Sequence, residues 1–382
     1  MFRHQFTINP SVNLKPLIHD SNIELFEMIK NQLDHYKVQV LFVKSCKRGA
    51  VSIAKELLKS NFKVGRYAYN ESFRLACANN HLGIARWLWG LDKNINIHTK
   101  HEEAFRYACQ NGHLEVAKWL WQLHQNIDIH AENEGAFIYA CIRGHLEVAK
   151  WLWQLGQNIN IHAKYEKAFR DACQNGHLEV AQWLLKLNQN IDIHAKNEGA
   201  FRSACQNGHL VIAQWLLQLN QNINIHASGE LAFIDSCGNG HLEVAKWLWQ
   251  LNQNIDMHAL NEEAFSSACI CGHLEVAKWL WQLDQNIYDE NEFTFCYTCE
   301  NGHLEIAQWL LQLNKNISIC EYRYAFKYAC KNGHLEVAKY VAGATSLRSA
   351  HYVRTSGISF YKFIGTGERS ELSVARLRQQ RI

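Results

Sequence analysis

Histidines are the residues whose type and spacing most readily suggest chemistry in this sequence, because imidazole binds metal ions and exchanges protons near neutral pH. One set recurs at steps of thirty to thirty-two residues, at His81, His113, His145, His177, His209, His241, His273, His303 and His334. A second set recurs at His98, His130, His162, His194, His226 and His258. Zinc holds nitrogen ligands at about 2.0–2.1 Å, whereas neighbouring members of either set should lie one repeat apart, roughly 8–10 Å. Both sets therefore predict structural histidines and no metal site.

Cysteines invite the same question, since a chain with thirteen of them could be a disulfide scaffold. Ten recur once per repeat, among them Cys77, Cys109 and Cys141. Stacked helices lie too far apart for the roughly 4.4–6.8 Å between Cα atoms that a disulfide needs. Cys296 and Cys299 form a C-x-x-C pair, but Cys299 belongs to the recurring set. We expect reduced thiols that serve as small core residues, which fits a cytoplasmic protein.

Other catalytic patterns do not stand out from the repeating background. The glycines occur singly, so no phosphate-binding loop is indicated, and no Ser/His/Asp or paired-carboxylate arrangement recurs. Glu115 and Lys118, repeated in later copies, predict a solvated i, i+3 ion pair. The sequence therefore predicts a protein that is not an enzyme and that has no cofactor, no metal and no small-molecule substrate.

Composition and charge narrow the range of partners. No segment resembles a signal peptide, and none reaches eighteen uninterrupted apolar residues, so no membrane association is expected. The net charge is +3, and the tail from Gly343 to Ile382 carries seven Arg and Lys against two Glu, or +5, which leaves about −2 for the rest. Nucleic acid is therefore not the expected partner of the repeats, although the basic tail keeps this alternative open.

The repeating element itself is a pair of helices. Each copy has a phenylalanine eight residues before the motif position: Phe42, Phe73, Phe105, Phe137, Phe169, Phe201, Phe233, Phe265, Phe295 and Phe326. Apolar residues spaced at i, i+1, i+4 and i+5 around that phenylalanine predict a first helix, a glycine turn follows, and a second helix is apolar over most of its circumference. We expect an N-terminal segment with a capping half-repeat over 1–37, ten repeats over 38–345, and a basic tail over 346–382.

Tryptophans are confined to the second helices, for example at Trp87, Trp119 and Trp151. A recurring tryptophan, on a helix that is apolar nearly all round, predicts a core column and not a ligand cage. Burying each one would contribute on the order of 2 kcal/mol.

A unit of about 33 residues built as turn, helix and helix, with GHLEV at the start of the second helix, resembles the ankyrin repeat, and the resemblance covers roughly residues 38 to 342. The tryptophan-rich second helix and the NIDIHA connector are most similar to the large ankyrin families encoded by giant DNA viruses. The resemblance implies an all-α ankyrin-repeat solenoid of about ten helix-turn-helix units with short connector loops or β-turns.

One departure from the family pattern lies at the start of the first helix, where Glu103-Ala104-Phe105-Arg106 replaces T-P-L-H. We expect the column that begins at Glu102 to stabilise the helix start through the helix dipole. The histidine column that begins at His98 should link adjacent connectors.

Positions at which the copies differ are the best indicators of a binding surface, because core columns repeat. By resemblance, first helices and connector tips line a concave groove that holds protein partners. The predicted contacts are Arg106, Tyr107, Gln110, Ile138, Tyr139, Ile142, Arg170, Asp171, Arg202 and Ile234. The predicted function is a non-catalytic scaffold or adaptor for a protein partner, with a host protein in the host cytoplasm as the partner if the source is viral. The alternatives are a self-associating, virion-associated structural component and nucleic-acid contact through the tail.

Overall fold

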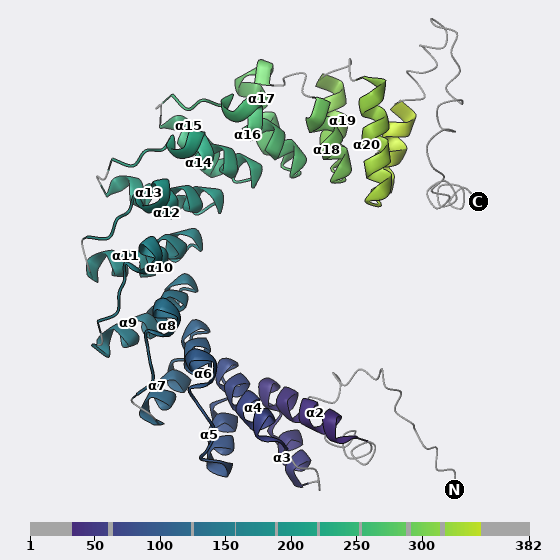
Figure 1. Cartoon of the computed structure of the whole chain (residues 1–382). Coiled ribbons are helices and arrows are strands. Elements are labelled where there is room, and N and C mark those ends of the chain that lie inside the picture. The colour runs from purple at the N-terminus through teal and green to yellow at the C-terminus, as the bar shows by residue number, and fades with distance from the viewer. Residues whose placement is uncertain are drawn as a thin grey trace, which may run out of the picture. The chain divides into compact units, whose positions relative to one another are not determined.

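The computed structural model consists of helical hairpins joined by connectors (Figure 1). It describes residues 33–59, 64–123, 126–156, 158–187, 190–219, 222–251, 254–287, 292–313 and 318–344. Nearly all of the predicted N-terminal segment and cap, and the basic tail from 346, lie outside the described residues. The chain divides into two compact parts, Met1–Lys196 and Asn197–Ile382, which we call the N-terminal half and the C-terminal half.

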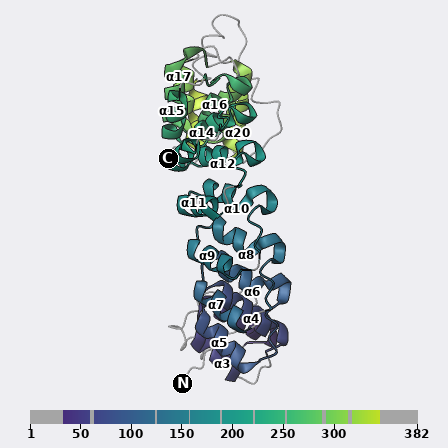
Figure 2. The ribbon, with the colours of Figure 1, turned by 90° about the vertical axis from the view of Figure 1, so that its left-hand side faces the viewer.

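The N-terminal half contains five hairpins. Their helices are α2 (His35–Arg48), α3 (Val51–Lys59), α4 (Arg66–Ala78), α5 (Leu82–Leu91), α6 (Thr99–Gln110), α7 (Leu114–Leu123), α8 (Ala131–Ile142), α9 (Leu146–Gln154), α10 (Ala163–Gln174) and α11 (Leu178–Leu187). The first helices α2, α4, α6, α8 and α10 pack side by side. Each second helix packs on the first helix of its own repeat, so the half has two helical layers (Figure 2).

The C-terminal half repeats this arrangement. Its helices are α12 (Ala195–Gln206), which begins at the boundary, α13 (Leu210–Gln218), α14 (Ala227–Gly238), α15 (Leu242–Gln250), α16 (Ala259–Ile270), α17 (Leu274–Leu283), η4 (Gln285–Ile287), α18 (Glu292–Glu300), α19 (Leu304–Leu313), α20 (Ile319–Lys331) and a last helix over 335–344. The described residues thus form ten hairpins and include no strand, which confirms the predicted all-α repeat solenoid.

The core lies between the two layers and is built from the recurring columns. Nine of the ten phenylalanines, from Phe42 to Phe295, are among the largest fully buried side chains. Cysteines such as Cys109 and Cys141 are buried and free, as predicted. Phenylalanines also contact tryptophans of the next repeat; the ring centroids of Phe73 and Trp119 are 6.0 Å apart. These aromatic contacts join neighbouring repeats.

The tryptophans, which we predicted to form a core column, are only partly buried. All thirteen are at least partly exposed, and Trp153 is 36% exposed. In α7 the fully buried residues are Val116, Ala117 and Leu120, which face the first helix, whereas Trp119 and Trp121 lie at the edges of that face. A second helix in a two-layer array is covered on one side, so its wide apolar surface extends into solvent.

The turn between the two helices of a repeat depends on glycine. Gly112, Gly144 and Gly240 have φ of +78°, +77° and +79°, a left-handed conformation that glycine adopts without steric penalty. The first histidine column packs over these glycines from the next repeat, since a Cβ added at Gly144 would lie 2.5 Å from Nδ1 of His177. The adjacent asparagine bonds to the preceding repeat: Asn111 Nδ2 donates to the carbonyl of Ala78 at 2.8 Å. The Asn-Gly-His turn is therefore a junction between repeats.

The start of the first helix differs from what the sequence predicted. Three successive residues are left-handed in α6, where Lys100, His101 and Glu102 have φ of 55–60°. The same turn recurs at the start of α8, α10, α14 and α16, with positive φ at the corresponding residues of α12. A left-handed residue other than glycine costs roughly 1–2 kcal/mol, although Asn and Asp tolerate the conformation better than most. Such a turn persists only if other contacts stabilise it.

A buried carboxylate at the end of the left-handed turn supplies those contacts. His130 Nδ1 donates to Glu134 Oε1 at 2.9 Å. Glu134 Oε1 also accepts the backbone N–H of Asn160, in the next connector, at 3.2 Å. The equivalent pairs His98–Glu102, His162–Glu166, His226–Glu230 and His258–Glu262 recur. The link between connectors that we predicted for the histidines is thus made in several repeats by the glutamate, which the histidine orients.

Candidate functional site

The first-helix layer brings most of the predicted contact residues to one face of the N-terminal half. Arg106, Tyr107 and Gln110 lie on α6, and their equivalents lie on α8 and α10, which flank one another. Tyr107 is half-buried and Tyr139 is 36% exposed. Gln110, Ile142 and Asp171 are half-buried in the same layer. Arg202 and Ile234 belong to the C-terminal half, on α12 and α14.

Two of the predicted contacts are not on the surface. Ile138 is only 2% exposed and Ile234 only 3% exposed, so neither side chain is available to a partner as predicted. Ile138 is buried because α8 is packed between α6 and α10, and a side chain that points toward a neighbouring first helix is covered by it. Substitution there would disturb the core.

The arginines among the predicted contacts have a structural role that the sequence did not reveal. Arg106 donates from Nε to the carbonyl of His101 at 2.6 Å and from Nη2 to that of Lys100 at 3.1 Å. Arg170 and Arg202 make the equivalent Nε bonds, each at 2.7 Å. These bonds satisfy carbonyls that the left-handed turn leaves without helical partners. The arginine column therefore stabilises the turn, and its guanidinium groups are already engaged.

Charged residues missed by the sequence analysis cover the face between α4 and α6. The buried Arg74 pairs with Glu71 and, at 2.9 Å between Nη1 and Oε1, with the buried Glu103. Lys100 approaches both carboxylates at 3.8 and 3.7 Å. Burial alone would raise the pKa of Glu71, but its hydrogen bond to Arg74 and the nearby charges lower that pKa below its usual value. These ion pairs join α4 to α6, and the charged groups on this face are engaged with one another.

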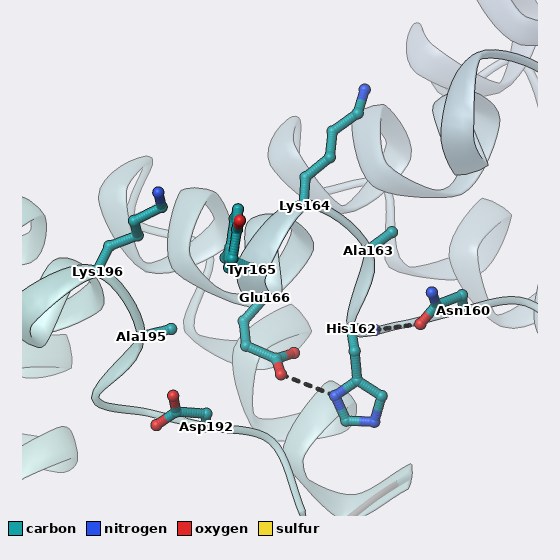
Figure 3. A pocket seen from close by; sticks show the side chains of 9 residues that line it. All are labelled: Asn160, His162, Ala163, Lys164, Tyr165, Glu166, Asp192, Ala195 and Lys196. Carbon is teal, nitrogen blue, oxygen red and sulfur yellow. Dashed lines mark hydrogen bonds and ion pairs between the residues drawn. The ribbon is translucent and has the colours of Figure 1, made fainter.

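A hollow of about 460 Å³ lies between the connectors that precede α10 and α12 (Figure 3). Lys164, Tyr165 and Lys196 point to one side of it, and the Nζ atom of Lys196 is 4.2 Å from the Tyr165 ring centroid. On the other side, Glu166 accepts from His162 Nδ1 at 2.8 Å. The ring of Tyr165 is 69% exposed, which adds an aromatic contact point at a connector tip. In the sequence, the variation of residues at the connector tips indicated that this position could contribute to a binding surface.

The described part of the chain contains no group of three or more His, Cys, Asp and Glu side chains able to hold a metal ion. Burial raises the pKa of the core thiols, that of Cys46 to about 12, so these cysteines are protonated near neutral pH. None of the described helices combines the length and apolarity needed to cross a membrane.

Stacked helical hairpins with one core shared between neighbours define a repeat solenoid. A family model described as "Ankyrin repeats (3 copies)" matches this chain at residues 73–163, 105–197, 154–227, 169–261, 201–291 and 265–348. The chain therefore belongs to the ankyrin-repeat family.

Among solved structures, the chain is similar to the crystal structure of the human ASB11 ankyrin repeat domain. The TM-score is 0.41 and the sequence identity 20%, over 55% of this chain and 97% of that chain. Comparison with curated protein sequences gave no match.

Proposed function

We propose that this ankyrin-repeat protein is a non-catalytic scaffold that binds a segment of another protein along its first-helix layer. The supporting observation is the residue two positions after each recurring phenylalanine, which differs between repeats although none of these side chains is buried. In chain order this position holds Lys44, Leu75, Tyr107, Tyr139, Asp171, Ser203, Asp235, Ser267, Tyr297 and Tyr328. A surface that varies over an invariant core fits recognition of one particular partner.

Within the N-terminal half, the proposed contacts are those predicted residues that remain accessible and are not committed to a turn. Tyr107 and Tyr139 occupy the same position in neighbouring repeats and supply the aromatic anchors. Gln110 and Ile142 lie beside them, and Tyr165 extends the surface to the connector tip. Asp171, which pairs with Lys167, supplies an acidic edge.

The biological setting that we propose is that of an adaptor in the cytoplasm. The support is the set of reduced core thiols and the likeness of the tryptophan-rich second helices and NIDIHA connectors to ankyrin proteins of giant DNA viruses. In that setting the partner is a host protein.

Affinity purification from a lysate, with a matched pair of variants, tests the proposed function. Tyr107→Ala with Tyr139→Ala removes the aromatic anchors, whereas Lys118→Ala with Lys150→Ala alters exposed residues of the second-helix layer. We expect a co-purifying protein to be lost with the tyrosine variant alone, once circular dichroism has shown equal folding. Equal recovery with all three chains would contradict binding through this face. Light scattering then tests self-association, and deletion of 346–382 with a salt titration tests nucleic-acid contact through the tail.

A further inference from the structure

The first helices of the last two repeats carry an aromatic block, which we define as Phe293, Tyr297, Tyr324 and Tyr328. Phe293 and Tyr324 lie two residues before the recurring phenylalanine of their repeats, and Tyr297 and Tyr328 lie two residues after it. In the eight earlier repeats the preceding position holds Val40, Glu71, Glu103, Gly135, Lys167, Gly199, Leu231 and Glu263. Both positions are aromatic only in the last two repeats.

The structure places two pairs of these rings on neighbouring helices. Helices α18 and α20, which carry them, pack against each other (Figure 1). The ring centroids of Phe293 and Tyr297 are 6.5 Å apart, and those of Tyr324 and Tyr328 are 4.4 Å apart. Phe293 is 67% exposed, Tyr324 49% and Tyr297 44%. Proteins seldom leave so many large apolar side chains exposed in one place unless the surface binds something.

The charges around the aromatic block are mainly positive. Arg323, Lys327 and Lys331 are exposed on α20, on the same side as Tyr324 and Tyr328. The Nζ atoms of Lys327 and Lys331 lie 5.8 and 5.6 Å from the Tyr328 ring centroid. Glu300 of α18 is half-buried beside them. A basic border around an aromatic centre is complementary to an acidic segment with an apolar anchor.

We propose that the aromatic block is a docking site for an acidic segment of a partner protein that carries an aromatic or aliphatic anchor residue. The aromatic rings receive the anchor, while Lys327 and Lys331 pair with carboxylates beside it. The inference rests on the proposed function, since it assigns partner chemistry to the first helices of the last two repeats. It places that contact on α18 and α20 and not on the helices that carry Tyr107 and Tyr139.

The arrangement of the rings favours a peptide over a nucleic acid. Sequence-tolerant binding of single strands requires open aromatic faces on which bases stack. Here the rings contact one another in pairs, with interplanar angles of 28° for Phe293 and Tyr297 and 36° for Tyr324 and Tyr328. Each ring thus has a partner ring beside it, and Lys327 and Lys331 lie over the ring of Tyr328, which leaves less free aromatic face for stacking bases and suits a side-chain anchor.

The test is selection of a random dodecapeptide library displayed on phage with the full chain, followed by fluorescence anisotropy with an enriched peptide. Phe293→Ala with Tyr324→Ala removes the two outer rings. Lys327→Glu with Lys331→Glu reverses two exposed charges and leaves the rings in place, so it is informative even if the first variant folds poorly. The Tyr107→Ala, Tyr139→Ala chain is the matched control, and a copy of the peptide with Lys in place of each acidic residue controls for charge.

We expect the enriched peptides to be acidic with an apolar residue and to bind at least tenfold more weakly to the ring variant and to the charge variant. Binding to the Tyr107→Ala, Tyr139→Ala chain should be unchanged, and the charge-reversed peptide should not bind. Neutral or basic peptides, no enrichment, unaltered binding to the variants, or displacement of the peptide by oligothymidine would overturn the inference. Peptides lost only with the Tyr107→Ala, Tyr139→Ala chain would overturn it while supporting the proposed function.

Discussion

Replacing Gly272 with alanine should reduce the free energy of unfolding by about 2–3 kcal/mol through two separable effects. Gly272 has φ of +92°, where the Cβ atom of alanine is strained by roughly 1–2 kcal/mol. The new Cβ would also lie 2.5 Å from Cε1 and 2.7 Å from Nδ1 of His303, in the next repeat. That ring bonds the backbone of Ile270, so displacing it forfeits a hydrogen bond worth about 0.5–1.5 kcal/mol.

Two further variants separate these effects. Gly229 also has a left-handed φ, +72°, but no described atom lies within 4 Å of the position that a Cβ would take there, so Gly229→Ala should show the strain alone. In a double-mutant cycle, Gly272→Ala should be about 1 kcal/mol less damaging when His303 is already alanine, because the collision is gone.

Urea unfolding followed by tryptophan fluorescence gives the free energies, since the half-exposed tryptophans report on burial along the array. The slopes of the transitions must agree among the variants for the comparison to hold. Equal losses for Gly272→Ala and Gly229→Ala, together with no coupling to His303, would show that the junction between repeats contributes nothing and would refute the reasoning.

Four further outcomes are expected from the same unfolding measurement. Glu134→Ala should cost about 2–3 kcal/mol because it removes the hydrogen bonds by which a buried carboxylate joins two connectors. The exposed control Glu147→Ala should cost under about 0.5 kcal/mol, and equal costs would contradict the linking role. Leu260→Gly should stabilise the chain by about 1 kcal/mol by relieving φ of +55°, whereas Leu260→Ala, which keeps a Cβ, should bring no gain. Burial lowers the pKa of His241 below 6.5, so its contribution to stability is present above pH 6.5 and is lost as the pH falls. His241→Asn should flatten this loss of stability at acid pH, and an unchanged pH profile would contradict the role of His241. Hydrogen bonding to Glu262 raises the pKa of His258, so the stability that His258 contributes is present at low pH and is lost as the pH rises. His258→Gln should abolish this pH dependence.

The repeat architecture was predictable because each inference could be checked in ten copies. A phenylalanine that recurs ten times is expected to occupy similar environments, and nine of the ten, Phe105 among them, are buried. The depth of burial of the tryptophans was not predictable from helical periodicity. Periodicity gives the angle of a side chain around its helix, whereas its exposure depends on whether another layer covers that angle.

The left-handed turn was harder to predict because its cause lies in contacts across repeats. A local signal did exist, since the middle residue of the turn is Asn133, Asn197, Gly229 or Asn261 in four repeats, and Asn and Gly are the residues that tolerate positive φ. His101 and Tyr165 at the same position hide that signal. The role of Arg106 depends on carbonyls that only this turn exposes, so it could not be inferred before the turn was known.

These contacts also determine how the variable positions should be interpreted. Several residue types occur at the position after the recurring phenylalanine, and some of them stabilise the array, Arg106 by donating to the carbonyls of the turn and Ile138 by filling the layer between neighbouring first helices. Variation at that position therefore reports, at least at these residues, how each repeat is stabilised. The side chain one residue further on is not buried, so Tyr139 in one repeat and Ser203 in another can both occupy that position without exposing a turn carbonyl or the core. Differences among repeats are thus informative about binding only where the structure shows that stability does not depend on the side chain.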